Sequence, residues 1–242
     1  MDDEALAALM QRVGGWSAMV GAGLLMAAGV GFGGLTFGND AETVLQTIAA
    51  QPRWYWPAVH LAFAAGSVLW IGAFIALNSS FRETVARLLG SLGVVSIVLG
   101  AALHVIDSFI SGSALTSLAN QWATASAADR AEIERVAETL LMVLGGTWVG
   151  VIVLFHGVPF VFTGTSVARS ERYPRFLRYV GLTAGVGSIF TGALMLVIPR
   201  SVPSALYYVF AAAGSFWMIG VGYILKHPPQ PALRTHETLQ VA

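Results

Sequence analysis

Long runs of apolar residues, separated by short polar segments, follow one another along most of the chain. A membrane-spanning helix needs about 20 mostly apolar residues. Six runs meet this length, and they cover residues 13–37, 55–77, 88–111, 143–166, 178–198 and 204–225. No segment shows the alternation of apolar and polar positions over about ten residues that a membrane β-barrel strand needs. Because backbone groups in lipid must bond within their own segment, we predict an all-α, polytopic membrane helical bundle of about six transmembrane helices.

The polar segments between these runs contain helix-start signals. Asn39 or Asp40 is placed to cap a short helix over 41–50. Ser126, with Asp129 three residues later, resembles a capping box. The helix that begins there is expected to continue into the fourth span. We therefore expect small helices outside the membrane on one side of the bundle.

The composition supports a membrane location. Hydrophobic residues make up 56% of the 242 residues and charged residues only 11%, whereas a soluble domain carries about 25% charged residues. The lipid bilayer is therefore the expected partner of most of the surface. Cysteine is absent, which excludes thiol nucleophiles, disulfides and cysteine-ligated metal sites. The formal net charge is +0 and there is no basic block, so nucleic acid is not an expected partner.

Basic residues are distributed unequally between the two sides of the predicted bundle. One side holds nine of them: Arg12, Arg82, Arg87, Arg169, Arg172, Arg175, Arg178, Lys226 and Arg234. The other side holds four: Arg53, Arg130, Arg135 and Arg200. The positive-inside rule therefore predicts a multi-pass protein of the cell membrane with both termini in the cytoplasm. On the outer side, Trp54, Tyr55 and Trp56 are expected to lie in an aromatic belt at the membrane interface.

The apolar runs also resemble one another. We predict one six-span domain over 1–226 and a disordered cytoplasmic tail over 227–242, where prolines cluster. Within the domain, spans two and six share the pattern Ala-Ala-Gly-Ser-x-x-x-Ile-Gly, at 64–72 and 212–220. Spans one, three and five each open with Arg-x-x-Gly. Either the chain was assembled from repeated helical hairpins, or these matches arose by chance because the spans use few types of apolar residue.

Ionisable residues inside the predicted spans are the candidates for chemistry. His60, His104 and His156 lie in spans two, three and four, and Asp107 is the one acidic residue well inside a span. A charged side chain at the bilayer centre costs about 2.5–3.5 kcal/mol by insertion scales, so a function is the default hypothesis. At a rise of about 1.5 Å per residue, His60 and His104 both lie about 8–10 Å below the outer surface. The sequence therefore predicts that they lie level on neighbouring helices.

Two further residues extend this constellation. Asp107 follows His104 at i+3, so the two share a helix face, and the aspartate can orient a histidine or act as a ligand beside it. His156 lies nearer the middle of the membrane. Gly157 and Pro159 beside it can kink span four and so shift its position.

Three hypotheses account for these residues. In the first, two histidines, either His60 with His104 or His60 with His156, are axial ligands of a haem b that transfers electrons to or from a quinone. This resembles six-helix cytochrome b proteins of the ascorbate type, but those use two histidine pairs, and spans five and six contain no histidine here. In the second, His60, His104 and Asp107 bind a transition metal near the outer face. In the third, no cofactor binds, and the histidines hydrogen-bond to neighbouring helices.

Signatures of familiar enzymes are absent from the sequence. There is no Gly-x-Ser-x-Gly elbow, no His-Glu-x-x-His motif and no phosphate-binding loop. Whether the chain is an enzyme is therefore left open. The alternative to a redox subunit is a non-enzymatic membrane protein, either a small-ligand binder or transporter or an accessory subunit of a larger membrane complex.

The stretch over 160–196 carries a resemblance to known sequences. In it, Arg172-Tyr173-Pro174-Arg175-Phe176-Leu177 precedes a glycine-rich span. This pattern resembles a broad group of uncharacterised bacterial and archaeal membrane proteins of about six helices. The function of that group is undefined, so the resemblance implies a fold and carries over no functional residue.

Overall fold

The computed structural model describes residues 3–32, 40–198 and 201–227, and the described residues are helical apart from short connections. In chain order the elements are α1 (Asp3–Gly31), α2 (Ala41–Ala49), α3 (Tyr55–Ser79), α4 (Thr84–Phe109), the π-helical η1 (Ile110–Leu115), α5 (Thr116–Thr124), α6 (Ala127–Val151), the π-helical η2 (Ile152–Gly157), α7 (Val158–Arg169), α8 (Arg175–Leu194) and α9 (Ser201–Lys226). The predicted all-α class is confirmed. The predicted tail over 227–242 lies outside the described residues, except for His227.

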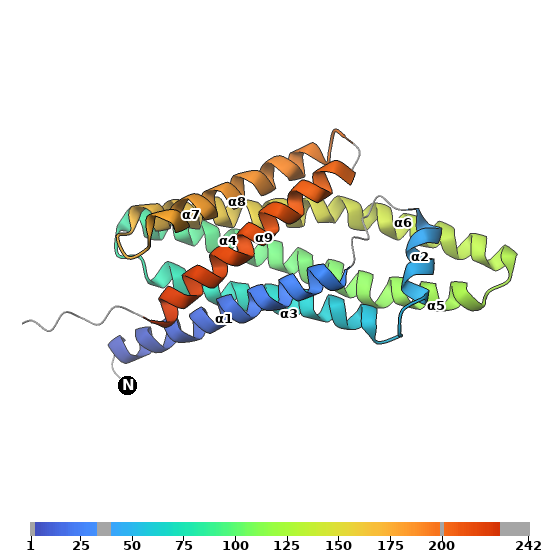
Figure 1. Ribbon diagram of the computed structural model, residues 1–242, viewed down its shortest axis with the longest axis horizontal. Coiled ribbons are helices and arrows are strands. Elements are labelled where there is room, and N and C mark those ends of the chain that lie inside the picture. Colours follow the sequence, from blue (N-terminus) through green and yellow to red (C-terminus); the bar gives the residue numbers. More distant parts are fainter. Residues whose placement is uncertain (1–2, 33–39, 199–200, 228–242) are drawn as a thin grey trace, which may run out of the picture.

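The long helices form a closed ring (Figure 1). α1 packs against α3, α3 against α4, and α4 against α7 and η2; α7 packs against α8, α8 against α9, and α9 returns to α1. The ring encloses a core with large aromatic side chains, among them Trp70, Phe155 and Trp217, each fully buried. The core is therefore shared by helices that are far apart in the sequence.

Five helices in the described part of the chain are long and apolar enough to cross a membrane: Glu4–Gly31, Tyr55–Ser79, Thr84–Thr124, Ala127–Arg169 and Pro203–Lys226. The chain is thus a multi-pass membrane protein. The fifth predicted span, now α8, is not among these five. It carries Arg175 and Arg178 in its first turn, which leaves it a shorter apolar stretch than its neighbours have.

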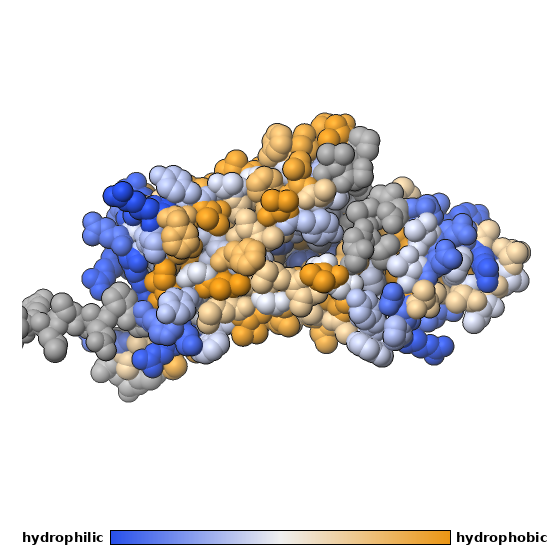
Figure 2. Space-filling model, viewed as in Figure 1, coloured by the Kyte–Doolittle hydropathy of each residue, from blue (hydrophilic) through white to orange (hydrophobic). Residues whose placement is uncertain are grey.

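Two of the five helices are much longer than a bilayer requires. The rods α4–η1–α5 and α6–η2–α7 run for 41 and 43 residues, about twice the length that crosses a membrane. Their extensions, with α2, form a second hydrophobic core around Leu45, Leu115 and Leu144. This part is the right-hand one of the two ends where hydrophilic, blue residues gather in the space-filling view (Figure 2). The bundle thus carries a small helical head on one side of the apolar belt.

Two of the helix caps predicted from the sequence are present in this head. Asp40 Oδ1 accepts a hydrogen bond of 2.8 Å from the backbone N–H of Thr43, and this bond holds the pKa of Asp40 below its usual value. Ser126 Oγ accepts from the N–H of Asp129, at 3.3 Å. The alternative cap, Asn39, lies outside the described residues.

The predicted aromatic belt is only partly formed. Trp54 is exposed, at 69%. Trp56, in contrast, is buried at 4% exposure and donates from Nε1 to the backbone carbonyl of Ser111, at 3.0 Å. The expectation for Trp56 was wrong, because the start of α3 lies against η1 rather than against lipid.

α1 and α9 cross closely at one end of the bundle. A Cβ added to Gly15 would lie 2.6 Å from the carbonyl oxygen of Gly222, and one added to Gly222 would lie 2.7 Å from the carbonyl oxygen of Gly15. Only glycine permits this approach of two backbones. Farther along α1, at Gly23 and Gly29, nothing lies within 4 Å of an added Cβ. The two helices therefore diverge from the crossing, as the blue and red ribbons show in Figure 1.

Replacing Gly222 by Ala is expected to destabilise the bundle, because the new methyl group meets backbone that cannot rotate away. The expected loss is about 1–3 kcal/mol, measured as the unfolding free energy or midpoint in detergent. Gly23→Ala is the matched control, since it adds the same atom into open space on α1. Equal stabilities of the two variants would contradict the close crossing.

Candidate functional site

A cavity of about 470 Å³ lies inside the ring. Its walls come from α1, α3, α4, η1, α6, η2 and α9. The lining residues are Leu25, Met26, Gly29, Val30, Phe32, His60, Phe63, His104, Asp107, Ser108, Ser111, Trp148, His156, Tyr207, Tyr208, Ala211, Ala212, Ser215 and Phe216. Figure 2 shows a hollow within the orange apolar belt, where α1 and α9 diverge. Most of the lining is apolar, and a few polar groups converge on it.

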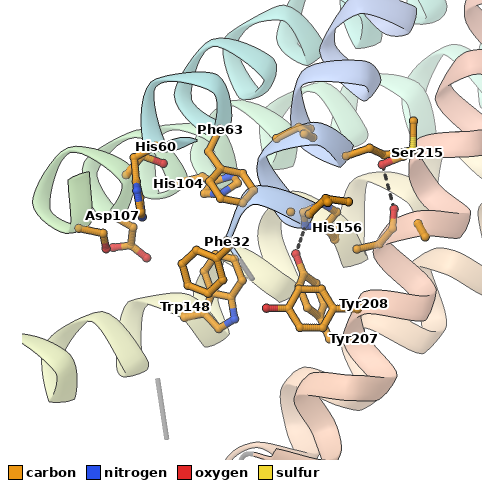
Figure 3. A pocket seen from close by; sticks show the side chains of 18 of the residues that line it. Phe32, His60, Phe63, His104, Asp107, Trp148, His156, Tyr207, Tyr208 and Ser215 are labelled. Atoms are coloured by element: carbon orange, nitrogen blue, oxygen red, sulfur yellow. Dashed lines mark hydrogen bonds between the residues drawn. The ribbon is translucent and has the colours of Figure 1, made fainter. Parts of the chain in front are cut away.

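The structure brings the four predicted site residues to this one cavity. His60, His104, His156 and Asp107 all line it, with exposures of 4%, 2%, 6% and 4%. In Figure 3, His60 and Asp107 lie at one end and His156 at the other, with His104 between them. Side chains from three different spans therefore share one space, although the depth argument placed only His60 and His104 at the same level.

The position of His60 depends on the π-helical segment η1. Gly112 of η1 packs so closely that an added Cβ would lie 2.7 Å from the Cβ of His60. The ring's Nδ1 lies 3.0 Å from the carbonyl oxygen of Trp56. Since a carbonyl can only accept, Nδ1 carries the proton. In the neutral ring, Nε2 is then an acceptor on the opposite edge.

His104 is oriented by a serine of the neighbouring helix. Its Nδ1 lies 2.9 Å from Ser67 Oγ. The hydroxyl of Ser67 donates to the carbonyl of Phe63, at 2.8 Å, so its oxygen accepts from His104. Nε2 of His104 is therefore also an acceptor when the ring is neutral. The phenyl ring of Phe63 contacts both histidines, with ring centroids 6.0 Å from His60 and 5.4 Å from His104.

A proline determines the local structure around His156. Pro159, in the first turn of α7, has no N–H to donate, and the helix before it takes the π-helical form of η2. The carbonyl of Leu154 is instead bonded by Ser96 Oγ of α4, at 3.0 Å. His156 lies inside η2, and its Nδ1 is 2.9 Å from the hydroxyl of Tyr207. The predicted disturbance of span four is thus present as a π-helical turn.

Only one of the two carboxyl oxygens of Asp107 has a hydrogen-bond partner. Its Oδ1 accepts a hydrogen bond of 2.8 Å from Thr147 Oγ1 of α6. Its Oδ2 is buried and has no hydrogen-bond partner in the structure. A buried, unpartnered carboxyl oxygen costs about 1–3 kcal/mol or more. Because this cost arises at the wall of a cavity, Asp107 is a candidate binding group.

The positions of the histidines can be compared with the haem hypothesis and with the metal hypothesis. The rings of His104 and His156, which the haem hypothesis did not pair, lie with centroids 6.5 Å apart, while the predicted pair His60 and His104 share Phe63 as a neighbour. Within the described ranges, no group of three or more His, Asp or Glu side chains could hold a metal ion. The metal site of His60, His104 and Asp107 gains no support and stays a prediction, as does the binding of haem.

A second, more polar cavity of about 540 Å³ lies on the other side of His60. It is lined by Pro57, His60, Leu61, Ser108, Phe109, Gly112, Ser113, Thr116, Ser117 and Asn120. His60 and Ser108 line both cavities. The two residues therefore form a wall between the apolar cavity and a hydroxyl-rich groove that runs towards the helical head.

Several lining residues were not predicted from the sequence. Phe63 and Ser67 follow His60 at i+3 and i+7, so the helical period could have placed them on its face. Tyr207 and Tyr208 of α9 lie in an apolar run, and no sequence pattern there indicates which residues they contact. Their position opposite His156 follows only from the closure of the ring, which the sequence does not reveal.

The family comparison covers nearly the whole bundle. A family model described as "Domain of unknown function (DUF4386)" matches residues 13–225. The chain belongs to this family. The match agrees with the resemblance seen over 160–196 and extends it to every long helix. No curated protein and no solved structure matches the chain, so the function of this family member has to be argued from the site.

Removing the partner of Asp107 is expected to weaken the fold. Thr147→Val leaves both carboxyl oxygens of Asp107 unbonded, at a cost of about 1–3 kcal/mol, to be measured by unfolding in detergent. Thr139→Val is the control on the same helix, since this hydroxyl bonds only the backbone at the surface. The double variant Asp107→Leu with Thr147→Val should recover part of the loss. Failure of Thr147→Val to differ from Thr139→Val would show that the pair contributes nothing.

Proposed function

We propose that the protein is a multi-pass membrane protein that binds a small, largely apolar molecule inside the bilayer. The observation that carries this proposal is the cavity of about 470 Å³. Sites for small molecules are typically apolar cavities of about 300–1,000 Å³ with a few convergent polar groups. His60, His104 and Asp107 are those groups here.

We infer that the ligand enters sideways from the lipid. α1 and α9 meet at Gly15 and Gly222 and then separate, and both helices contribute walls of the cavity. Gly29 of α1 and Ala212 of α9 are small residues on those walls. The gap between them lies in the apolar belt (Figure 2), where lipid rather than water surrounds the protein.

The proposal includes six spans with cytoplasmic termini. α7 ends and α9 begins at opposite ends of the bundle, and α8 joins them while packing beside both (Figure 1). This path supports a sixth crossing by α8. The excess of basic residues on the side of Arg169 and Lys226 supports a cytoplasmic location for that end. There, Arg169 Nε donates to Glu83 Oε1 at 2.9 Å, and this bond lowers the pKa of Glu83.

Haem is the second candidate for the same cavity. One observation supports it: the rings of His104 and His156 lie edge-on to one another with centroids 6.5 Å apart, and a neighbour holds Nδ1 of each. If haem were bound, His104 and His156 would be the residues that hold it, and it would supply one-electron chemistry. A visible absorption spectrum of the purified protein decides between the candidates. A Soret band that disappears in His104→Ala would establish haem and overturn the binding of a separate apolar ligand.

The topology can be tested with single cysteines, because the chain contains none of its own. In intact cells, a membrane-impermeant maleimide is expected to label Ala128→Cys and Leu196→Cys, and to label Glu171→Cys only after permeabilisation. All three positions are exposed. Labelling of Leu196→Cys and Glu171→Cys from the same side would rule out the crossing by α8. A reversed pattern would place the termini outside.

The cavity can be tested with a photoprobe. A dodecanol with a diazirine in its chain and a terminal alkyne is added to the protein in lipid nanodiscs, and labelled peptides are mapped by mass spectrometry. Labelling is expected on peptides containing Phe63, His104 or Tyr208. Gly29→Trp should fill the gap and reduce this labelling about tenfold, since the lost contacts weaken binding by about 1.4 kcal/mol or more.

The matched control is Gly23→Trp. Both glycines lie on α1 and have open space around them, but only Gly29 lines the cavity. Gly23→Trp should leave the labelling unchanged. If the probe labels only lipid-facing residues, or if both tryptophan variants label as the parent protein does, the cavity is not a binding site.

A further inference from the structure

Three hydrogen-bond acceptors belong to side chains at the His60 end of the cavity. Nδ1 of His60 is held by the carbonyl of Trp56 and Nδ1 of His104 by Ser67. Both neutral rings therefore present an unprotonated Nε2 on the other edge. Asp107 adds Oδ2, which has no partner and lies on a side chain that is 4% exposed. A ligand that donates hydrogen bonds would satisfy these atoms.

The charges around the cavity favour a cation over an anion. Among its described lining residues there is an aspartate and no Lys or Arg. A carboxylic acid or phosphate ligand would therefore bring its charge towards Asp107 without a compensating cation. A cationic head group would instead form a charge-assisted hydrogen bond with Asp107, which is about twice as strong as a neutral one.

Aromatic rings surround the same end of the space. Phe32 and Phe63 each contact His60, with ring centroids 6.0 Å away, and Trp148 contacts His104 at 5.6 Å. Figure 3 shows Phe32, Phe63 and Trp148 grouped beside the histidines. Aromatic faces attract ammonium groups within about 6 Å of the ring centroid. The rings therefore provide a second, independent preference for a cation.

We propose that the ligand is a lipophilic amine: an apolar body with one protonated amino group. Asp107 Oδ2 binds the ammonium group, Nε2 of His60 and of His104 accepts its remaining N–H groups, and the aromatic rings pack around it. The apolar body occupies the space between α1 and α9 towards Ala212. This assignment rests on the proposed function, since it names the class of molecule that the same cavity binds.

Competition against the dodecanol photoprobe tests this assignment. Dodecylamine, dodecanol, dodecanoate and N-acetyldodecylamine share one chain and differ in the head group. Dodecylamine is expected to compete about tenfold more effectively than dodecanol, because its ammonium group forms a charge-assisted hydrogen bond with Asp107. Dodecanoate should be the weakest. N-acetylation removes the charge and should reduce competition to the level of the alcohol.

The aspartate is tested in the same assay. Asp107→Asn should abolish the advantage of dodecylamine over dodecanol, because the amide carries no charge, and its unfolding midpoint in detergent shows whether the variant is folded. Glu138→Gln is the control, because it removes one negative charge from an exposed position on α6. If Asp107→Asn does not fold, the comparison of the four competitors on the parent protein still tests whether the cavity prefers an amine.

The outcomes separate the two proposals. Labelling of the cavity without any preference among the four head groups would overturn the amine assignment and leave apolar binding in place. A preference for dodecanoate would overturn it as well. Failure of the photoprobe to label the cavity at all would instead overturn the proposed function on which the assignment rests.

Discussion

The contact between Gly15 and Gly222 determines the shape of the whole bundle. It closes the ring at one end by bringing two backbones together, and the helices diverge from there (Figure 1). Membrane helices associate through close packing rather than through a hydrophobic driving force, so such small-residue contacts decide which helices meet. The cavity is the consequence of this geometry. It occupies the space that two helices crossing at one end cannot fill at the other.

The site also depends on how the backbone satisfies its hydrogen bonds inside the membrane. No water is available there, so a carbonyl released by a proline needs another donor. Ser96 supplies it to Leu154, and the resulting π-helical turn positions His156. At η1 the indole of Trp56 bonds the carbonyl of Ser111 in a similar way. Both irregular turns lie next to a histidine of the cavity, in keeping with the frequent occurrence of π-helical turns at functional sites.

The sequence revealed more about the site than about the arrangement of the helices. Hydropathy gave the long helices, and counting residues from their ends placed His60 and His104 at the same depth, in agreement with the cavity they share. Hydropathy gives the length of a helix but not its rotation or its neighbours. For this reason Trp56 was assigned to the lipid interface although it lies against η1. The repeat of helical hairpins stays a prediction, since similar sequence does not by itself give similar contacts.

The opposite wall of the cavity illustrates the same limit. Tyr207 pairs with His156 across 51 positions of the chain, and no local pattern in α9 marks it. Its place follows from the return of α9 to α1, hence from the crossing at Gly222. A single sequence shows which residues are costly in lipid, such as Asp107, but not which residues are brought to them.

The wall between the two cavities links binding to the surrounding water. His60 and Ser108 separate the apolar cavity from a groove lined by Ser113, Ser117 and other hydroxyl groups. On the proposed orientation, both the groove and the wide end of the gap between α1 and α9 lie towards the outer surface. An amine in a membrane keeps its charged group near that interface and its chain in the lipid, as long basic side chains do. Its chain can therefore enter between the helices while its ammonium group moves only a short distance to Asp107. A ligand with its polar group in the middle of its apolar body would have no such route, which makes a terminal amine the best fit to this cavity.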